Sequence, residues 1–188
     1  MMKLKIRMKL LSDTVFGNGV SVPGGEDISI LYDDEGFPYY KGGTLKGVFR
    51  EELRNYLNWT GEEDPDKTVT ELLGKAGDAE DDGAKLFFSD LTIPEDVRKK
   101  VLLENLSPEE VLDIFSDVRM FTALDDDGIA KKGSLRMARC VIRGISCCGE
   151  IECPEEHKDL VIRTLKCIKW IGTLRNRGFG HVEIREVR

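Results

Sequence analysis

The sequence predicts an α+β fold, a ferredoxin-like βαββαβ core with inserted β-hairpins and a helical insertion. Strand patterns open and close the chain, and two amphipathic helix patterns each lie between strand patterns. The 188 residues are 40% hydrophobic, which suffices for one core. We therefore expect a single domain over residues 1–188, with a linker inserted at about 60–83 and a helical segment plus hairpin inserted at 94–133.

The first strand is predicted at residues 3–11, KLKIRMKLL, because basic and apolar residues alternate there. Successive side chains point to opposite faces of a strand, so one face of this strand is apolar and the other is basic. The next segment, 12–43, is rich in Gly, Asp and Pro and contains one short apolar run at 28–32. This composition predicts a long excursion that contains a β-hairpin.

The first helix is predicted at residues 44–59, TLKGVFREELRNYLNW, with Thr44 as its N-cap. Apolar side chains recur there at helical spacing and form one stripe. The stripe consists of Leu45, Val48, Phe49, Leu53, Tyr56 and Leu57. The acidic segment that follows, 61–83, has only a brief apolar patch, which predicts an exposed, mobile linker with at most one short helix.

Strand, helix and hairpin patterns then alternate through the middle of the chain. Residues 84–93, AKLFFSDLTI, predict a strand, and residues 95–115 predict a helical insertion. The second part of that insertion starts at Ser107, where SPEE has the pattern of a capping box. Two further strands are predicted within 117–145, joined by the flexible LDDDGIAKKG, and another at 146–153, SCCGEIEC.

The second helix is predicted at residues 154–172, where a proline and several acids occupy the first turn. Lys166 and Lys169 lie in its expected last turn, as the helix dipole favours. Gly172 is expected to end this helix and to open a glycine-rich loop, GTLRNRGFG. The final strand is predicted at 181–187, HVEIREV, which completes the βαββαβ order.

Charge is distributed unevenly along this acidic chain. The net charge is −7, yet residues 131–188 contain 13 Lys and Arg against 7 Asp and Glu. A basic C-terminal segment favours contact with a polyanion, and a solvated helix face is the alternative explanation. The sequence has no apolar run long enough to cross a bilayer, and its N-terminus lacks the features of a secretory signal. We expect a cytoplasmic protein without membrane contact.

Five cysteines lie in the C-terminal third of the chain. Their odd number and their position favour buried, reduced thiols over a secreted disulfide framework. A zinc site at Cys147, Cys148 and Cys153 is the alternative, although their spacing lacks paired C-x-x-C units.

Two glycine-rich segments are candidates for phosphate contacts. Glycines in the loop allow close approach of a ligand to the backbone, and the guanidinium groups of Arg175 and Arg177 match phosphate geometry. A tight turn with solvated arginines is the alternative. The segment 41–47, KGGTLKG, opens a helix and carries Lys46, so its exposed N–H groups and the helix dipole favour an anion. No G-x-x-x-x-G-K-[ST] motif is present, and we expect no ATP hydrolysis.

The chain resembles the RAMP superfamily, the repeat-associated RNA-binding proteins of CRISPR systems, and it is most similar to the repeating backbone subunit of type III effector complexes. The resemblance rests on LLSDTVFGNG, PYYKGGTLKGVFREEL, GAKLFFSDL, RMFTALDDDGIAKKGSLRMARCVIRG and GTLRNRGFGHVEI, in this order. These stretches cover most of the chain outside residues 58–82 and 94–113. The resemblance implies an RRM-like core that binds guide RNA and assembles into a head-to-tail filament. It also implies other CRISPR effector subunits and a complementary target RNA as partners in antiviral defence.

The same resemblance assigns roles to individual residues. It implies that the start of the first long helix and the glycine-rich loop contact the guide backbone. The residues at those positions are Lys46, Arg50, Gly172, Arg175, Arg177, Gly178 and Gly180. The segment 124–133 occupies the place of the thumb hairpin that kinks the guide–target duplex. It is short here and contains Asp125, Asp126 and Asp127, which weakens the expectation that it contacts RNA phosphates.

Cleavage of target RNA in the family depends on one aspartate after the first strand, acting with a divalent metal. Asp27 is the best match, and we expect it to be the catalytic residue and a metal ligand. Asp33 matches a later loop aspartate and is expected as a second ligand. Carboxylate oxygens suit Mg²⁺ or another divalent cation, which shares its coordination sphere with phosphate and polarises the scissile group.

Two alternatives to this activity stay open from the sequence. Acids in glycine-rich loops often form turns, and Asp33, Asp34 and Gly36 suit a hairpin turn. In that case the chain is a non-catalytic RNA-binding scaffold. The other alternative is a guide-precursor-processing endoribonuclease, which needs an acid–base pair near the glycine-rich loop. His181 is the only histidine there.

Overall fold

The computed structural model describes residues 1–17, 19, 26–75 and 84–187. Its elements are β1 (Met2–Leu10), α1 (Gly42–Thr60), α2 (Pro65–Leu73), β2 (Phe87–Phe88), α3 (Glu95–Leu102), α4 (Pro108–Phe115), β3 (Ser116–Phe121), β4 (Arg136–Val141), β5 (Ser146–Cys153), η1 (Glu155–His157), α5 (Lys158–Cys167), η2 (Arg175–Arg177) and β6 (Val182–Glu186). The strands β1, β5 and β6 lie within a residue or two of the predicted ranges.

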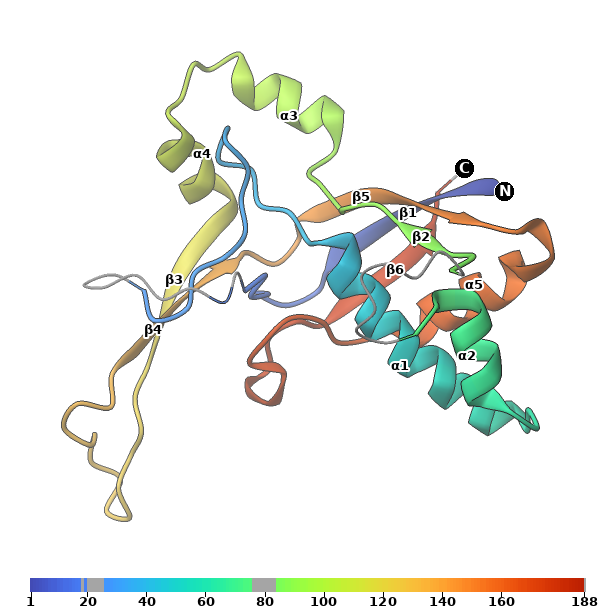
Figure 1. The fold of residues 1–188 in the computed structure, drawn as a ribbon. Coiled ribbons are helices and arrows are strands. Elements are labelled where there is room, and N and C mark those ends of the chain that lie inside the picture. The colour runs from blue at the N-terminus through green and yellow to red at the C-terminus, as the bar shows by residue number, and fades with distance from the viewer. Residues whose placement is uncertain (18, 20–25, 76–83, 188) are drawn as a thin grey trace.

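A four-stranded antiparallel sheet forms the centre of the molecule, with strand order β2-β5-β1-β6 (Figure 1). Helix α1 lies between β1 and β2 in the sequence, and α5 lies between β5 and β6. This order and these connections are those of a ferredoxin-like βαββαβ core. The predicted α+β fold class is therefore confirmed, with the segments between β2 and β5 as its elaborations.

The apolar face of β1 lies in the core. Its buried side chains belong to one cluster with the buried stripe of α1 and with Val161 and Leu165 of α5. Met8 lies opposite Cys147 on one neighbouring strand and Ile184 on the other, and all three are buried. The basic side chains of β1 are exposed on the other face of the sheet. The alternation in the sequence thus sets which face of the sheet is covered.

Helix α1 starts at Gly42, two residues before the predicted start, and the prediction of Thr44 as N-cap is wrong. Lys41 is the N-cap and makes no side-chain cap bond. Instead, the carboxylate of Asp90 accepts a hydrogen bond from the N–H of Gly42 at 2.7 Å. A Cβ at Gly42 would stand 2.3 Å from the carbonyl oxygen of Phe88, so glycine permits this close contact with the β2 segment. A tertiary partner thus replaces the local cap.

The second long helix is shorter than predicted, since α5 ends at Cys167 rather than at Gly172. The residues after it are extended and pair with the start of β6. The N–H of Val182 donates to the carbonyl of Lys169, and the N–H of Ile171 donates to the carbonyl of Gly180, both at 2.9 Å. These sheet-like bonds take the place of further helical bonds, and a sequence window does not reveal them.

Helix α2 lies within the segment predicted as an exposed linker. The expected short helix is thus present, but its Val69, Leu72 and Leu73 are buried in the core, so the expectation of exposure is wrong for these three residues. Asp64 caps its start by accepting a hydrogen bond from the N–H of Lys67. The remainder of the predicted linker, 76–83, lies outside the described residues.

The predicted helical insertion consists of α3 and α4. The capping box of α4 is confirmed, because the side chain of Ser107 and the side chain of Glu110 each accept a hydrogen bond from the other residue's backbone N–H. That bonding lowers the pKa of the Glu110 carboxyl. Val111, Leu112 and Phe115 of α4 are buried, whereas α3 has no buried residue. The insertion is thus attached to the core mainly through α4.

Strands β3 and β4 form a separate two-stranded sheet whose connecting hairpin projects from the body of the molecule (Figure 1). The two predicted strands are confirmed. At the tip, the carboxylate of Asp125 accepts hydrogen bonds from the N–H groups of Asp127 and Ile129 at 3.1 and 2.8 Å. This aspartate forms the turn of the hairpin.

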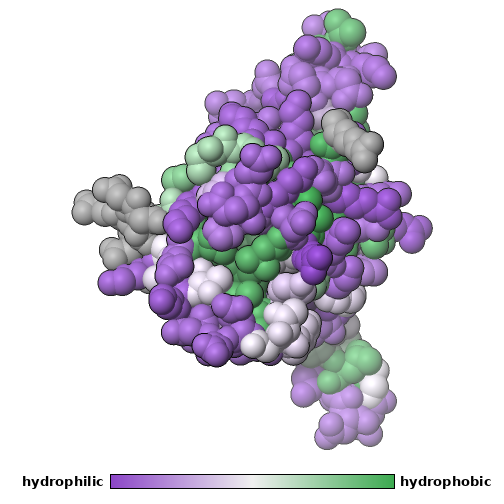
Figure 2. All heavy atoms as spheres, turned by 90° about the vertical axis from the view of Figure 1, so that its right-hand side faces the viewer, coloured by the Kyte–Doolittle hydropathy of each residue, from purple (hydrophilic) through white to green (hydrophobic). Residues whose placement is uncertain are grey.

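The opposite end of the molecule is formed by α1, α2 and α5. Seen from that end, hydrophilic residues dominate the surface and surround a smaller apolar area (Figure 2). None of the helices within the described ranges is long and apolar enough to cross a membrane. All five cysteines are free in this structure, and burial raises the pKa of Cys147 to about 12.

Candidate nucleic-acid interface

A cleft of about 400 Å³ lies between the start of α1 and the glycine-rich loop. Thr44, Gly47 and Glu51 line it from α1, while Gly172 and Arg175 line it from the loop. These two segments are more than 120 positions apart in the sequence. The fold therefore unites the two glycine-rich segments that the sequence singled out as phosphate sites.

The loop directs its two arginines to different places. Residues Arg175–Arg177 form a single 3-10 turn flanked by Leu174 and Gly178, both in the left-handed region. Arg175 lines the cleft. The guanidinium carbon of Arg177 instead lies 5.6 Å from the ring centre of Phe121, at the base of the β3–β4 hairpin. The structure thus places Arg175 with α1 and Arg177 with the hairpin.

The three loop glycines also differ in what they do. At Gly172 and Gly180, a Cβ would stand 2.3 Å from the carbonyl oxygen of Val15 and 2.0 Å from that of Ile171. Close backbone packing therefore requires both glycines. Gly178 has a φ of 82° but nothing within 4 Å of a Cβ, so its environment is open. Of the three, Gly178 has room for a ligand beside it.

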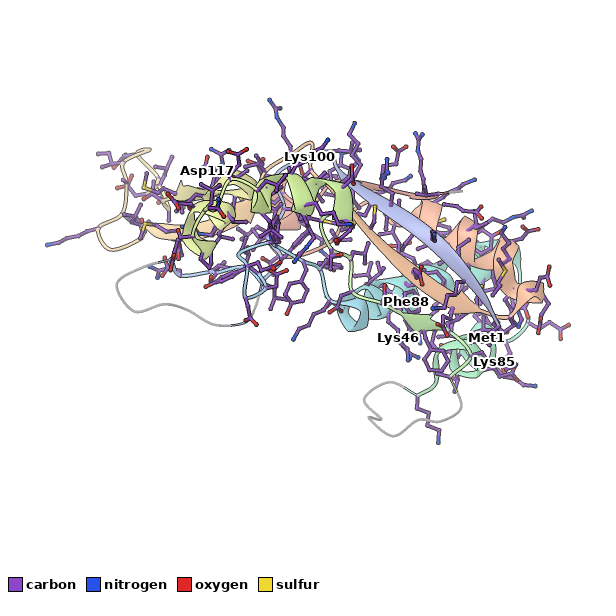
Figure 3. The ribbon with its side chains drawn as sticks, turned by 90° about the horizontal axis from the view of Figure 1, so that it is seen from above. Met1, Lys46, Lys85, Phe88, Lys100 and Asp117 are labelled. Atoms are coloured by element: carbon purple, nitrogen blue, oxygen red, sulfur yellow. The ribbon has the colours of Figure 1, made fainter. Side chains whose placement is uncertain are left out.

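Lys46 and Arg50 lie on α1 and do not line the cleft. Lys46 is half-buried beside the β2 segment, near Phe88 (Figure 3). The guanidinium of Arg50 donates hydrogen bonds to the carbonyls of Leu73 and Gly74 at 2.9 and 2.8 Å. Arg50 thus caps the C-terminal end of α2. This structural role explains the presence of an arginine at position 50 without any contact to RNA.

The side of the cleft opposite the loop contains Tyr40, which the sequence reasoning missed. Tyr40 is only 2% exposed, and its hydroxyl makes no well-aligned hydrogen bond with the described residues, although the backbone of Gly172 is close enough to lower its pKa. Burial raises the pKa of this phenol, while the backbone of Gly172 and the charge of Arg175 oppose that rise. Its one signal in the sequence is its position directly before KGGTLKG. The hydroxyl is neutral at physiological pH.

Acidic residues also lie beside the cleft. Glu51 lines it, and burial followed by the charge of Glu51 raises the pKa of the neighbouring Glu52. The charge of Arg175 lowers the pKa of Glu52. The positive charge of Arg175 therefore acts on the carboxylate of Glu52, which belongs to α1. The apolar part of the lining comes from Phe16, Leu31 and Val48, so the cleft offers hydrophobic walls and polar groups together.

Asp27 lies where the segment after β1 runs beside β4. Its side chain is exposed, and its Oδ2 accepts a hydrogen bond from the N–H of Met137 at 2.8 Å. The adjacent Glu26 pairs with Arg139, which also pairs with Asp113. These contacts hold Asp27 at the base of the projecting hairpin.

Asp33 closes a turn. Its Oδ1 accepts hydrogen bonds from the N–H groups of Glu35 and Phe37, and its Oδ2 pairs with Arg98 at 2.6 Å. Gly36 completes this turn with a φ of 88°. The turn that the sequence suggested for these residues is confirmed. Both carboxylate oxygens of Asp33 are engaged, which leaves little capacity for a metal ion.

The sequence model of the RAMP superfamily matches residues 7–183. The chain belongs to the RAMP superfamily. Two similar solved structures come from a type III-B Cmr-beta complex, one in its apo state and one bound to cognate target RNA. For the first, the TM-score is 0.77 at 15% identity, with 100% of this chain and 98% of the other covered. For the second, the TM-score is 0.71 at 13% identity, with 99% and 97% covered.

These TM-scores and coverages establish a shared fold along nearly the whole length of both chains. Comparison with curated protein sequences returns no match. The resemblance to the RAMP superfamily that the sequence motifs indicated is thus confirmed.

The RAMP resemblance also implies a divalent cation, and Asp27 is the residue that suits one. Its carboxylate is exposed, and its Oδ1 receives no hydrogen bond from the described residues. Within those residues, no group of three or more His, Cys, Asp or Glu side chains could hold a metal. Mg²⁺ commonly takes one or two carboxylates and completes its shell with water and substrate phosphates. Asp27 fits the requirement for one such carboxylate ligand.

His181 of this RAMP protein does not line the cleft that contains Arg175. Its ring stacks on Trp170, with ring centres 4.7 Å apart. An acid–base pair for guide processing would need both partners beside the RNA backbone. The arrangement of His181 therefore does not support that alternative.

Replacing Tyr40 with Phe is expected to leave the free protein as stable as before or to raise its melting temperature by about 2–4 °C. The reason is that the change removes a buried hydroxyl that has no well-aligned partner, and burial of such a group costs about 1 kcal/mol. Tyr56→Phe is the control, because that hydroxyl lies 3.5 Å from Arg163 at the surface. Thermal denaturation by circular dichroism measures both variants. A clear drop in the melting temperature of Tyr40→Phe would mean that the hydroxyl forms a stabilising hydrogen bond within the protein.

Gly47→Ala is expected to stabilise the free protein and, if the cleft binds RNA as proposed below, to weaken that binding. Gly47 is inside α1 and has nothing within 4 Å of a Cβ, so alanine should raise stability by about 0.5–1 kcal/mol. The added methyl group would enter the cleft and lower RNA affinity by roughly tenfold. Gly43→Ala is the matched control, since Gly43 is on the same helix but does not line the cleft. Equal RNA affinity of the two variants would contradict a role for this cleft.

Proposed function

We propose that this RAMP protein binds guide RNA as a backbone subunit of a type III CRISPR effector complex. The observation that carries the proposal is the cleft in which Arg175 and Gly172 of the glycine-rich loop face the start of α1. Two further facts support it. The two structures described above come from a type III-B complex, and one of them is bound to target RNA.

Guide binding would use the chemistry of the cleft mouth. A guanidinium such as that of Arg175 pairs with phosphate through two parallel hydrogen bonds. Gly178 has an open environment beside it, where the backbone of RNA could approach closely. Lys46 and Arg50 contribute less in this proposal, because the first is half-buried and the second holds α2.

We further propose that Asp27 takes part in cleavage of the target RNA. Its carboxylate would hold a divalent cation together with the scissile phosphate, at the base of the hairpin that occupies the place of the thumb. The bound cation would supply charge stabilisation at the phosphate. The hydrogen bond from Met137 orients the carboxylate and leaves its other oxygen for the cation. Asp33 is not included, because Arg98 and the turn occupy it.

A non-catalytic scaffold is the second candidate. It is favoured by the fact that Asp27 already satisfies a backbone N–H of β4. A carboxylate with that structural role needs no metal. Both candidate functions involve the same partners, which are guide RNA, complementary target RNA, further copies of the chain in a filament and other effector subunits. The complex would act in the cytoplasm, in antiviral defence.

The assembled complex, purified through a tag on this chain, tests the proposal. Sequencing the RNA that copurifies is expected to return guides that carry repeat-derived ends. RNA without repeat sequences, or no RNA at all, would contradict the assignment. Mixed cellular RNA would instead indicate a general RNA-binding protein.

A further inference from the structure

One face of the central sheet, which no helix of the described ranges covers (Figure 3), carries a basic and aromatic surface. Figure 3 shows this side, where β1 crosses the view without a helix over it. The exposed residues of β1 are Lys3, Lys5, Arg7 and Lys9. Directly opposite Arg7 on β6 is Arg185, and opposite Lys9 is Glu183. Residues directly opposite each other share a face, so two arginines stand side by side here.

Positive charge is in excess on this part of the face. Glu183 pairs with Arg185, and Glu186 pairs with Lys158. In contrast, Arg7 and Lys9 form no ion pair with any described residue. Both line a recess of about 440 Å³, together with Arg185 and the two acids Glu183 and Glu186. Like charges directly opposite each other on neighbouring strands destabilise a sheet. An anion in the recess would remove that repulsion.

The same strand edge continues to an exposed aromatic pair. Trp170 is 42% exposed, and one face of its indole stacks on His181 at 4.7 Å between ring centres. The carbonyl of His181 accepts hydrogen bonds from the N–H groups of Leu11 and Ser12, directly after β1. The aromatic pair thus lies at the end of the basic strand, on the outer side of the sheet.

A second polar recess begins at Leu11. It measures about 370 Å³ and is lined by Leu11, Asp13, Arg119, Arg143 and Phe179. The carboxylate of Asp13 forms an ion pair with Arg119 at 2.8 Å and accepts a hydrogen bond from the backbone N–H of Arg143. The side chain of Arg143 is exposed and has no carboxylate partner among the described residues. One recess lies along Arg7 and Lys9 and the other begins at Leu11, so positive charge lies on both sides of the point where His181 bonds to the chain after β1.

We infer that this surface, Arg7, Lys9, Arg143 and Trp170, binds a second segment of single-stranded RNA. A base stacks on the free face of the Trp170 indole, and the three cations contact phosphates on either side of it. Alternation of cations with an exposed aromatic ring is typical of surfaces that bind single strands. The second recess is also lined by Gly178 of the glycine-rich loop, whereas Arg175 of the same loop lines the cleft at α1, so the two surfaces meet at this loop. The inference rests on the proposed RNA-binding function.

Intrinsic fluorescence tests the stacking directly, because the chain has two tryptophans. Trp59→Phe leaves Trp170 as the only one, and a saturating single-stranded RNA should quench most of its emission. Trp170→Phe leaves Trp59, which is 76% exposed on α1, and its emission should not change. Quenching of both or of Trp59 alone would overturn the inference.

Affinity measurements on the same protein complete the test. Trp170→Ala should weaken binding of the RNA by about 5- to 100-fold, and Trp170→Phe by less, because a phenyl ring still stacks. Trp59→Ala should leave affinity unchanged. Arg7→Ala should reduce the slope of log affinity against log salt concentration by about one unit. Circular dichroism of each variant checks that it is folded.

The outcomes separate this inference from the proposed function. If the wild-type chain binds RNA and Arg175→Ala weakens it, but Trp170→Ala does not, only the second surface is refuted. If the wild-type chain does not bind RNA, the proposed function and this inference fail together. If Trp170→Ala changes only the association of protein copies in sedimentation, the face is a protein interface and the inference is wrong.

Discussion

Asp27→Asn is expected to lower metal-dependent cleavage of target RNA by at least about 100-fold in the assembled complex, while RNA binding stays the same. Asparagine keeps an acceptor for the N–H of Met137 but loses the charge that holds a cation. Loss of a residue that merely supports a metal ligand already costs about 10- to 100-fold, so loss of the ligand itself should cost no less. The measurement is cleavage of a labelled, complementary RNA in Mg²⁺, with EDTA as the metal-free reference.

Asp34→Asn is the matched control, because Asp34 is an exposed acid in the same segment, seven positions after Asp27. It should cleave like the wild type. Equal cleavage by the Asp27 and Asp34 variants would place the catalytic group elsewhere. Absence of cleavage in the wild-type complex would leave the scaffold as the function of this subunit.

Gly180→Ala is expected to destabilise the protein by about 2–4 kcal/mol, which corresponds to a drop in melting temperature of very roughly 4–16 °C. Two penalties combine at this position. The φ of 84° strains any residue with a Cβ, and that Cβ would stand 2.0 Å from the carbonyl oxygen of Ile171. The Gly180 carbonyl also accepts the N–H of Ile171, so the backbone cannot move away without breaking this bond.

Gly178→Ala isolates the first penalty. Gly178 has a φ of 82°, but nothing lies within 4 Å of a Cβ there. We expect a loss of about 1 kcal/mol, the cost of the left-handed conformation alone. Thermal and urea denaturation of both variants measures the difference. Equal destabilisation would show that the contact with Ile171 relaxes without cost.

Patterns confined to one segment predicted their elements well. The alternation in KLKIRMKLL produced β1 with its apolar face buried, and the apolar stripe of α1 points into the core. These patterns succeed because burial of one face is the main requirement of each element. The capping box at Ser107 likewise depends on residues three positions apart and was found.

Features that depend on tertiary partners escaped the sequence. The end of α5 is set by pairing of residues 169–171 with the start of β6, which no helix signal encodes. The N–H of Gly42 is satisfied by Asp90, 48 positions away. Arg50 has the residue type of an RNA contact, yet its guanidinium holds the end of α2. A charged side chain reveals its partner only once the fold is known.

In the candidate site, too, local patterns were informative and tertiary contacts were not. The glycines and arginines of the loop predicted an anion site, and Arg175 does line the cleft. The sequence could not separate Arg175 from Arg177, because a single turn sends one to α1 and the other to Phe121. Tyr40 was missed because an unpaired buried hydroxyl has no signature in a sequence.

The salt dependence of RNA binding by Arg175→Ala tests the central claim, that the cleft between α1 and the glycine-rich loop binds RNA. A phosphate contact releases counterions, so its loss should reduce the slope of log affinity against log salt concentration by about one unit. Arg54→Ala is the control, since Arg54 lies on α1 and pairs with Asp66 at the surface. We expect weaker binding and a reduced slope for Arg175→Ala and neither for Arg54→Ala. An unchanged slope for Arg175→Ala would contradict that claim.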